Sequence, residues 1–132
     1  MPSYQESLSS LVTDLKKRGS NYESKTIQKS LKYLEMDSLS FPHILVGGTN
    51  GKGSVCRIVA AVLSSSGKKT GLFVTPHLLY AQERISIDGI EIQPQEFIKI
   101  HEALELRLEG FYQSGNRKLS FFESTFLVAL SY

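Results

Sequence analysis

The stretch Gly48-Thr49-Asn50-Gly51-Lys52-Gly53-Ser54 decides the predicted fold of this chain. It follows the short apolar run His43–Val46, which is typical of a buried parallel strand. The apolar stretch 55–63 comes next and predicts a helix that ends at Gly67. Residues 70–74 then have the composition of a second strand. The order strand, glycine loop, helix, strand predicts an α/β fold with a P-loop-type parallel sheet and flanking helices.

The remaining segments carry helical or alternating apolar patterns. Asp88-Gly89 interrupts an alternating run, which is a β-hairpin signal. In chain order the patterns predict a helix from Tyr4 to Leu15 that stops at Gly19, a helix over 27–34, a linker at 38–42, a hairpin over 84–92, a helix from Pro94 through Leu108, a polar connection at 110–118 and an apolar helix over 121–130.

The bulk composition excludes several classes of protein. The chain has 132 residues, of which 41% are hydrophobic and 21% charged, so it suits one globular domain or part of one. Its net charge of +2 comes from scattered Lys and Arg residues, which argues against a nucleic-acid partner. One cysteine excludes an internal disulfide, and no stretch resembles a secretory signal or a membrane span. We therefore expect a cytoplasmic protein that binds neither nucleic acid nor a membrane.

The predicted elements describe an incomplete domain. Two parallel strands are fewer than such sheets usually have. The last apolar helix also runs to Tyr132 without a capping residue or a polar tail. We expect the natural protein to continue, with residues 1–132 forming the N-terminal part of an ATP-binding domain.

The glycine loop has the chemistry of a phosphate site. Gly48, Gly51 and Gly53 allow a tight turn that points backbone N–H groups inward. The helix that follows directs the positive end of its dipole at the same place. Lys52 supplies an ammonium for a transferring phosphoryl group, and the hydroxyl of Ser54 suits a magnesium ion that bridges the phosphates. We predict that residues 48–54 bind ATP and that Lys52 is catalytic.

The spacing of the loop differs from the common P-loop pattern. That pattern places Ser or Thr directly after the lysine, whereas Gly53 separates Lys52 from Ser54 here. The alternative interpretation is a structural turn between a strand and a helix, with Lys52 as a surface residue.

Four motifs in order resemble one enzyme family. The glycine loop is similar to that of folylpolyglutamate synthase and dihydrofolate synthase, which belong to the Mur ligase superfamily. Thr75-Pro76-His77-Leu78 resembles the family's Ser-Pro-His-Leu loop, Glu83-Arg84-Ile85 its Glu-Arg-Ile strand, and Phe121-Phe122-Glu123 its Phe-Phe-Glu segment. The motifs cover about the last two-thirds of the chain and are more specific together than one loop.

The resemblance implies an ATP-dependent ligase. Such enzymes phosphorylate a carboxylate of a pteroate or folate, and the amino group of glutamate attacks the acyl phosphate. By position, Thr75 and Glu123 join Ser54 as magnesium ligands, and Pro76 and His77 lie near the substrate. Residues 24–30 correspond to an early substrate-contacting stretch but depart from its usual wording. The family also has a further magnesium-binding histidine, a carbamoylated lysine and a second domain, so we expect the 132 residues alone to be inactive.

Two other functions fit parts of the pattern. A P-loop small-molecule kinase would use the same loop and leave a stable phosphorylated product. A non-catalytic fragment would retain nucleotide binding without a reaction. The residues also do not choose between dihydrofolate synthase, folylpolyglutamate synthase and both.

Overall fold

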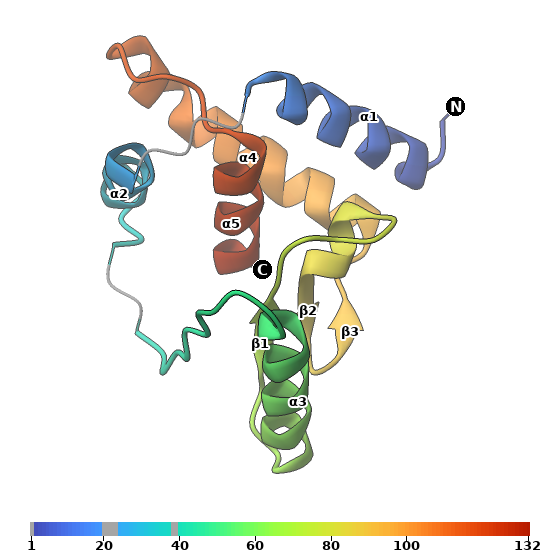
Figure 1. The fold of residues 1–132 in the computed structure, drawn as a ribbon. Coiled ribbons are helices and arrows are strands. Elements are labelled where there is room, and N and C mark those ends of the chain that lie inside the picture. Colours follow the sequence, from blue (N-terminus) through green and yellow to red (C-terminus); the bar gives the residue numbers. More distant parts are fainter. Residues whose placement is uncertain (1, 20–23, 38–39) are drawn as a thin grey trace. The chain divides into compact units, whose positions relative to one another are not determined.

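The computed structural model describes residues 2–19, 24–37 and 40–132 (Figure 1). The chain forms two compact units. Residues 1–42 and 94–132 make up one, which we call the helical unit, and residues 43–93 make up the other, which we call the loop unit.

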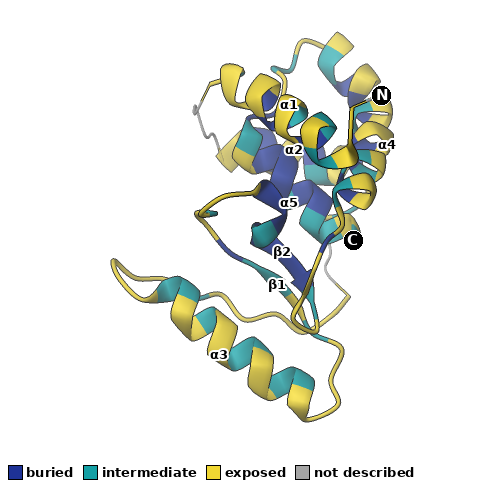
Figure 2. Ribbon diagram, turned by 90° about the vertical axis from the view of Figure 1, so that its right-hand side faces the viewer, coloured by how far each residue is buried: buried dark blue, intermediate teal, exposed yellow. Residues whose placement is uncertain are grey.

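The helical unit packs around one long helix. Its elements are α1 (Tyr4–Lys17), α2 (Ser24–Tyr33), α4 (Pro94–Gln113) and α5 (Phe121–Ser131). α1, α2 and α5 all contact α4, and Figure 2 shows buried residues on these helices in dark blue. The core side chains lie at helical spacing, as the sequence predicts, and include Leu8, Leu15, Phe97, Leu108, Leu127 and Val128.

Polar contacts fix the ends of these helices. Arg18, just after α1, donates two hydrogen bonds to the carboxylate of Glu105 on α4, at 3.0 and 3.2 Å. Arg107 of α4 donates to the backbone oxygen of Leu34 at 2.8 Å, which satisfies a carbonyl at the end of α2. The structure thus contains the predicted helices. Hydrogen bonds from Arg18 and Arg107 connect α4 to the ends of α1 and α2.

One predicted boundary in this unit is wrong. We expected a polar connection from Gly110, but α4 continues to Gln113. A Cβ on Gly110 would lie 2.5 Å from the hydroxyl oxygen of Tyr33. The glycine therefore lies inside the helix because α2 approaches it closely, and it does not mark a helix end.

The loop unit contains α3 (Lys52–Ser65), a 3-10 turn η1 (Ala81–Arg84) and the strands β1 (Gly71–Phe73), β2 (Ile85–Ile87) and β3 (Ile90–Glu91). The sheet order is β1-β2-β3, and both pairs are antiparallel. The predicted hairpin is confirmed. Asp88 and Gly89 connect β2 to β3 with φ of 50° and 79°, the left-handed values that a tight two-residue turn requires.

The predicted parallel sheet is the main correction. Residues 43–46 form no strand, and Ile44 and Leu45 are 67% and 93% exposed. β1 exists as predicted but pairs with β2 in the antiparallel sense. A strand is stable only when its N–H and C=O groups find a neighbouring strand, and no described segment offers a parallel partner to residues 43–46. The observed fold is an α/β chain with five α-helices and a small antiparallel sheet among its described residues.

The helix after the glycine loop is formed but not covered. No residue of α3 is buried, and Figure 2 shows the helix as exposed or intermediate along its whole length. Ile58 and Val62 are each 64% exposed. The sequence predicted this helix correctly, but among the described residues its contact with β1 leaves these apolar side chains exposed. In the described part of the chain, no helix is both long and apolar enough to cross a membrane.

The core of the helical unit gives a matched stability test on α4. We expect Leu108→Ala to lower the free energy of unfolding by about 2–5 kcal/mol, because its side chain is 1% exposed and its removal leaves a cavity. Leu106→Ala on the same helix is the control, since Leu106 is 73% exposed and the change should stay within about 0.5 kcal/mol. Urea unfolding followed by circular dichroism measures both. Equal effects of the two substitutions would contradict the assigned face of α4.

Candidate functional site

The glycine loop adopts a backbone that requires glycine at two positions. Gly48 has φ of 145° and Gly51 has φ of 75°, values that residues with a Cβ rarely adopt. α3 begins at Lys52, immediately after Gly51. The predicted loop-to-helix junction is therefore present, although no strand precedes it.

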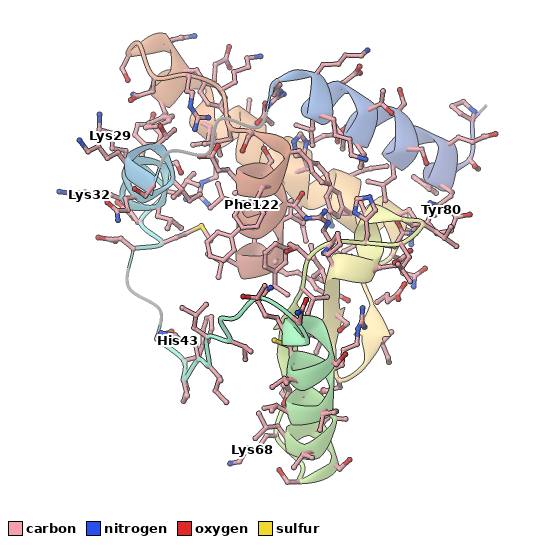
Figure 3. All side chains as sticks on the ribbon, viewed as in Figure 1. Lys29, Lys32, His43, Lys68, Tyr80 and Phe122 are labelled. Atoms are coloured by element: carbon pink, nitrogen blue, oxygen red, sulfur yellow. The ribbon has the colours of Figure 1, made fainter. Side chains whose placement is uncertain are left out.

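Lys52 folds back over this loop. Its Nζ donates to the backbone oxygen of Gly48 at 2.5 Å and to that of Thr49 at 3.3 Å. The ammonium thus lies beside the loop rather than extending into solvent. Lys68 makes a useful comparison, because it lies past the other end of α3 and projects away from it (Figure 3).

The start of α3 lacks the side-chain caps that α1 and α5 have. α1 and α5 begin with capping boxes, Ser3 with Glu6 and Ser120 with Glu123. The N-cap residue of α3 is Gly51, which has no side chain to accept a hydrogen bond, and the first turn of α3 has no acidic residue. The N–H groups of Gly53 and Ser54 donate to no acceptor in the described residues. The first turn of α3 therefore presents unsatisfied donors and the positive end of the helix dipole.

The space beside Gly53 is open. Gly53 lies within α3 without a positive φ, and a Cβ built on it meets no atom within 4 Å. Neither the backbone nor the packing of the described chain therefore demands glycine at this position. A bare Cα here leaves space for a group that approaches the amides closely, as a phosphate does.

The second predicted motif lies in a closed loop. Val74 N–H donates to the backbone oxygen of Arg84 at 2.9 Å, which joins the two ends of the segment 75–83. Within it, the Glu83 carboxylate accepts hydrogen bonds from the backbone N–H groups of Leu78, Leu79 and Tyr80 at 2.7, 2.8 and 2.6 Å. These bonds, that from Leu78 first, hold the pKa of the Glu83 carboxyl below its usual value.

His77 is held from one side by an arginine. The Nε of Arg84 donates to Nδ1 of His77 at 2.8 Å. Arg84 is buried, at 8% exposure, whereas Thr75 and Pro76 are exposed at the surface of the loop. The predicted substrate residues thus lie on one loop, and the Glu-Arg-Ile motif supplies the groups that support it.

Glu123 has a structural role in the helical unit. Its side chain is completely buried, and its two oxygens accept hydrogen bonds from Arg117 at 2.8 and 2.9 Å. The N–H and the hydroxyl of Ser120 also donate to it, each at 2.8 Å. Burial raises the pKa of Glu123, but Arg117 and Ser120 outweigh burial and hold that pKa below its ordinary value.

The predicted magnesium ligands fall into two groups. Ser54 and Thr75 belong to the loop unit and Glu123 to the helical unit. The hydroxyls suit a hard cation, but the Glu123 carboxylate is occupied by Arg117 and Ser120 in this arrangement. The described residues contain no group of three or more His, Cys, Asp or Glu side chains placed to hold a metal.

No known protein-family model matches the chain. Among curated proteins, it is 35% identical over 117 residues to the dihydrofolate synthase/folylpolyglutamate synthase of Buchnera aphidicola. This match covers 89% of the chain. Among solved structures, the Mycobacterium tuberculosis folylpolyglutamate synthase complexed with ADP has a TM-score of 0.86 at 30% identity over 98% of the chain.

The chain is similar in sequence and fold to folylpolyglutamate synthases. A bifunctional folylpolyglutamate synthase/dihydrofolate synthase with Mn, AMPPNP and L-glutamate bound is also similar, with a TM-score of 0.80 at 28% identity over 98% of the chain. The resemblance drawn from four motifs is thus confirmed. The chain spans 26% of the length of the Buchnera relative and 30% of each of the two solved chains.

The sequence did not predict the roles of two arginines, Arg84 and Arg117. Arg117 stands in no motif, so its pairing with Glu123 had no signal beyond a spacing of six residues. Arg84 belongs to a matched motif, but its contact with His77 requires the closed loop to be known. A groove of about 360 Å³ between α3 and the sheet, lined in part by Arg57, Ser64 and Asp88, contains none of the predicted site residues.

The buried carboxylate of Glu123 allows a pH-dependent test of stability. At neutral pH we expect Glu123→Gln to lower the free energy of unfolding by about 1–3 kcal/mol, because hydrogen bonds to a charged group are lost. The folded pKa is lowered, so this contribution is present above the unfolded value near 4.5 and disappears as the pH falls below it.

The measurement is chemical unfolding of wild type and variant between pH 7 and pH 3. The gap between them should narrow below about pH 4.5, the unfolded value. Glu109→Gln, an exposed carboxylate on α4, is the control and should leave stability unchanged. A gap that stays constant over the whole range would show that the Glu123 charge does not stabilise the helical unit.

Proposed function

We propose that this chain is the nucleotide-binding part of an ATP-dependent ligase that adds L-glutamate to dihydropteroate or a folate. The homologues carry these activities in their names, and the similar solved structures contain ADP or AMPPNP. The observation that carries the proposal is the uncapped start of α3, where a glycine loop, an ammonium and two unsatisfied amides meet. This arrangement suits the terminal phosphates of ATP.

The residues of the loop support the first half of the reaction. A carboxylate oxygen of the pteroate attacks the γ-phosphorus of ATP, and the bond to the ADP oxygen breaks. The amides at 53–54 and the ammonium of Lys52 neutralise the charge that spreads over the transferred phosphoryl group. The glutamate amine then attacks the acyl-phosphate carbon, inorganic phosphate leaves, and the amine loses a proton as the amide forms.

We propose Ser54, Thr75 and Glu123 as magnesium ligands. The bound ion would supply positive charge to the phosphates. Ser54 lies in the first turn of α3 and Thr75 just after β1, so both hydroxyls belong to the loop unit. Glu123 becomes a ligand only when it exchanges its bond to Arg117 for the ion. Pro76 and His77 are proposed to meet the pterin-bearing substrate, and a cytoplasmic location stays a proposal based on the sequence.

The second candidate function is nucleotide binding without catalysis, for the 132-residue chain alone. The chain spans about a quarter of its Buchnera relative, at 26%, and the carbamoylated lysine and extra histidine implied by the resemblance have no match in it. A kinase is the third, and its phosphorylated product would distinguish it from a ligase, which forms an amide.

Nucleotide binding is tested by substitutions in the loop unit. We expect wild type to bind Mg-ATP in calorimetry, and Lys52→Ala to weaken binding about tenfold or more, because an ammonium beside the phosphates is lost. Lys68→Ala is the matched control, since Lys68 is exposed past the far end of α3 (Figure 3). Equal affinity of the two variants would contradict the proposed site.

Gly53 supplies an independent variant of the same site. Gly53→Ala should leave the stability of α3 equal or slightly higher, because alanine favours helices and its Cβ meets no atom. Its Cβ should nevertheless obstruct the approach of a phosphate to the amides, so Mg-ATP affinity should fall. Unchanged affinity would exclude phosphate contact with the first turn of α3.

A turnover assay tests whether the 132-residue chain is active as a ligase by itself. With ATP, dihydropteroate and L-glutamate, the 132-residue chain should release no phosphate above background, because it lacks residues that the resemblance implies for catalysis. Phosphate release and product mass spectrometry measure this. Normal amide formation by the chain would overturn the prediction of inactivity, and a phosphorylated product without an amide would favour the kinase.

A further inference from the structure

We propose that Glu83 and Arg84 are positioning residues that preshape the loop 75–83 and present the Nε2–H of His77 to a hydrogen-bond acceptor of the substrate. The proposal rests on the proposed function for the identity of the substrate. The arrangement of the loop itself follows from hydrogen bonds within the loop unit. Neither residue is proposed to take part in the chemical step.

The Glu83 carboxylate organises the main chain of the loop. It accepts the N–H groups of Leu78, Leu79 and Tyr80, which are consecutive residues. Converging three N–H groups on one side chain requires two acceptor oxygens, which a carboxylate has and an amide does not. A glutamine would also direct its NH2 group at backbone donors. The site therefore specifies a carboxylate.

Side-chain packing does not explain the order of residues 78–80, although Ala81 and Gln82, which follow them, are buried. Leu78, Leu79 and Tyr80 are 91%, 78% and 47% exposed, and Tyr80 lies at the surface in Figure 3. Burial of these side chains therefore contributes little to fixing the loop. The hydrogen bonds to Glu83, together with the Val74–Arg84 backbone bond that closes the segment, provide the restraint instead.

Arg84 sets the chemical character of His77. Arginine is protonated at every physiological pH and only donates, so Nδ1 of His77, at 2.8 Å from its Nε, is the acceptor. In the neutral imidazole the proton then belongs to Nε2. His77 thus offers a donor, which matches a carbonyl, a carboxylate or an unprotonated ring nitrogen in the ligand. Arg84 is itself 8% exposed, so its guanidinium is held by the fold rather than by solvent.

The first experiment needs no ligand. It measures the hydrogen bonds from the N–H groups of residues 78–80 to the Glu83 carboxylate, which we call the clamp. In NMR hydrogen exchange, Glu83→Gln should accelerate the amides of Leu78, Leu79 and Tyr80 about tenfold or more, while those of Asp88 and Ile92, bonded within the sheet region, keep their rates. Glu91→Gln, an exposed carboxylate of the same unit, is the control. Unchanged rates for residues 78–80 overturn the clamp.

A direct measurement on wild type covers the case in which Glu83→Gln unfolds the unit. Scalar couplings across hydrogen bonds should connect the amide nitrogens of residues 78–80 with the carboxylate carbon of Glu83. Their absence in wild type, under conditions where couplings within the sheet are seen, overturns the clamp independently of any variant.

The second experiment reads the tautomer of His77. Imidazole nitrogen shifts in wild type should show a proton on Nε2 and none on Nδ1. Arg84→Met keeps the apolar stem but removes the donor, so a mixture of tautomers should appear, whereas Arg57→Met on exposed Arg57 should change nothing. A proton on Nδ1 in wild type, or an unchanged tautomer in Arg84→Met, overturns the role of Arg84.

The final titration separates this proposal from the proposed function. Dihydropteroate added with Mg-ATP should shift the Nε2 resonance of His77 and the amides of the loop, and Mg-ATP alone should shift those of Gly53 and Ser54. If only Gly53 and Ser54 respond, recognition through His77 is overturned and nucleotide binding stands. If Gly53 and Ser54 do not respond, the proposed function fails, and the exchange and tautomer results still decide the clamp.

Discussion

Backbone N–H groups that lack an intrahelical partner are the constraint on which this structure depends. The first turn of every helix has such donors, and each must find an acceptor or face solvent. In α1 and α5 a serine and a glutamate accept and return hydrogen bonds. In α3 a glycine occupies the corresponding position, and no side chain accepts. The same physical requirement is therefore met by side chains at the starts of α1 and α5, whereas the start of α3 stays open to an anion.

Glutamate carboxylates accept hydrogen bonds from backbone N–H groups at several places in the chain. Glu6 and Glu123 serve helix starts, and Glu83 serves the N–H groups of an irregular loop. The pKa of each is lowered, because each accepts bonds from the backbone or its neighbours that favour the charged form. No acidic residue stands in the first turn of α3. A carboxylate there would compete with phosphate for the same donors, so its absence agrees with the proposed nucleotide site.

Local patterns in the sequence predicted what local interactions determine. The Asp88-Gly89 turn, the core face of α4 and the junction at Gly51 all depend on residues close in the chain, and all are present. The failures concern partners distant in the chain. Residues 43–46 have the composition of a buried strand, but a strand needs a neighbour that composition does not supply. Gly110 looked like a boundary until Tyr33, 77 positions earlier, was found against it. The contacts of Glu123 and His77 with arginines join residues only six and seven positions apart, but they span irregular segments, whose geometry neither helical nor strand spacing predicts.

The exposed side chains of α3 bear on how the site works. The helix α3 contributes no buried residue, and the side chains of Leu45, Ile58 and Val62 are exposed. Burial of apolar side chains therefore contributes little to the stability of the residues around the glycine loop. A ligand that binds only the ordered loop adds stability by mass action, about 2.7 kcal/mol at a concentration one hundred times its dissociation constant. That is a substantial fraction of the stability of a small domain. Nucleotide binding and the ordering of α3 are therefore expected to be coupled, because the phosphate supplies the cap that Gly51 lacks.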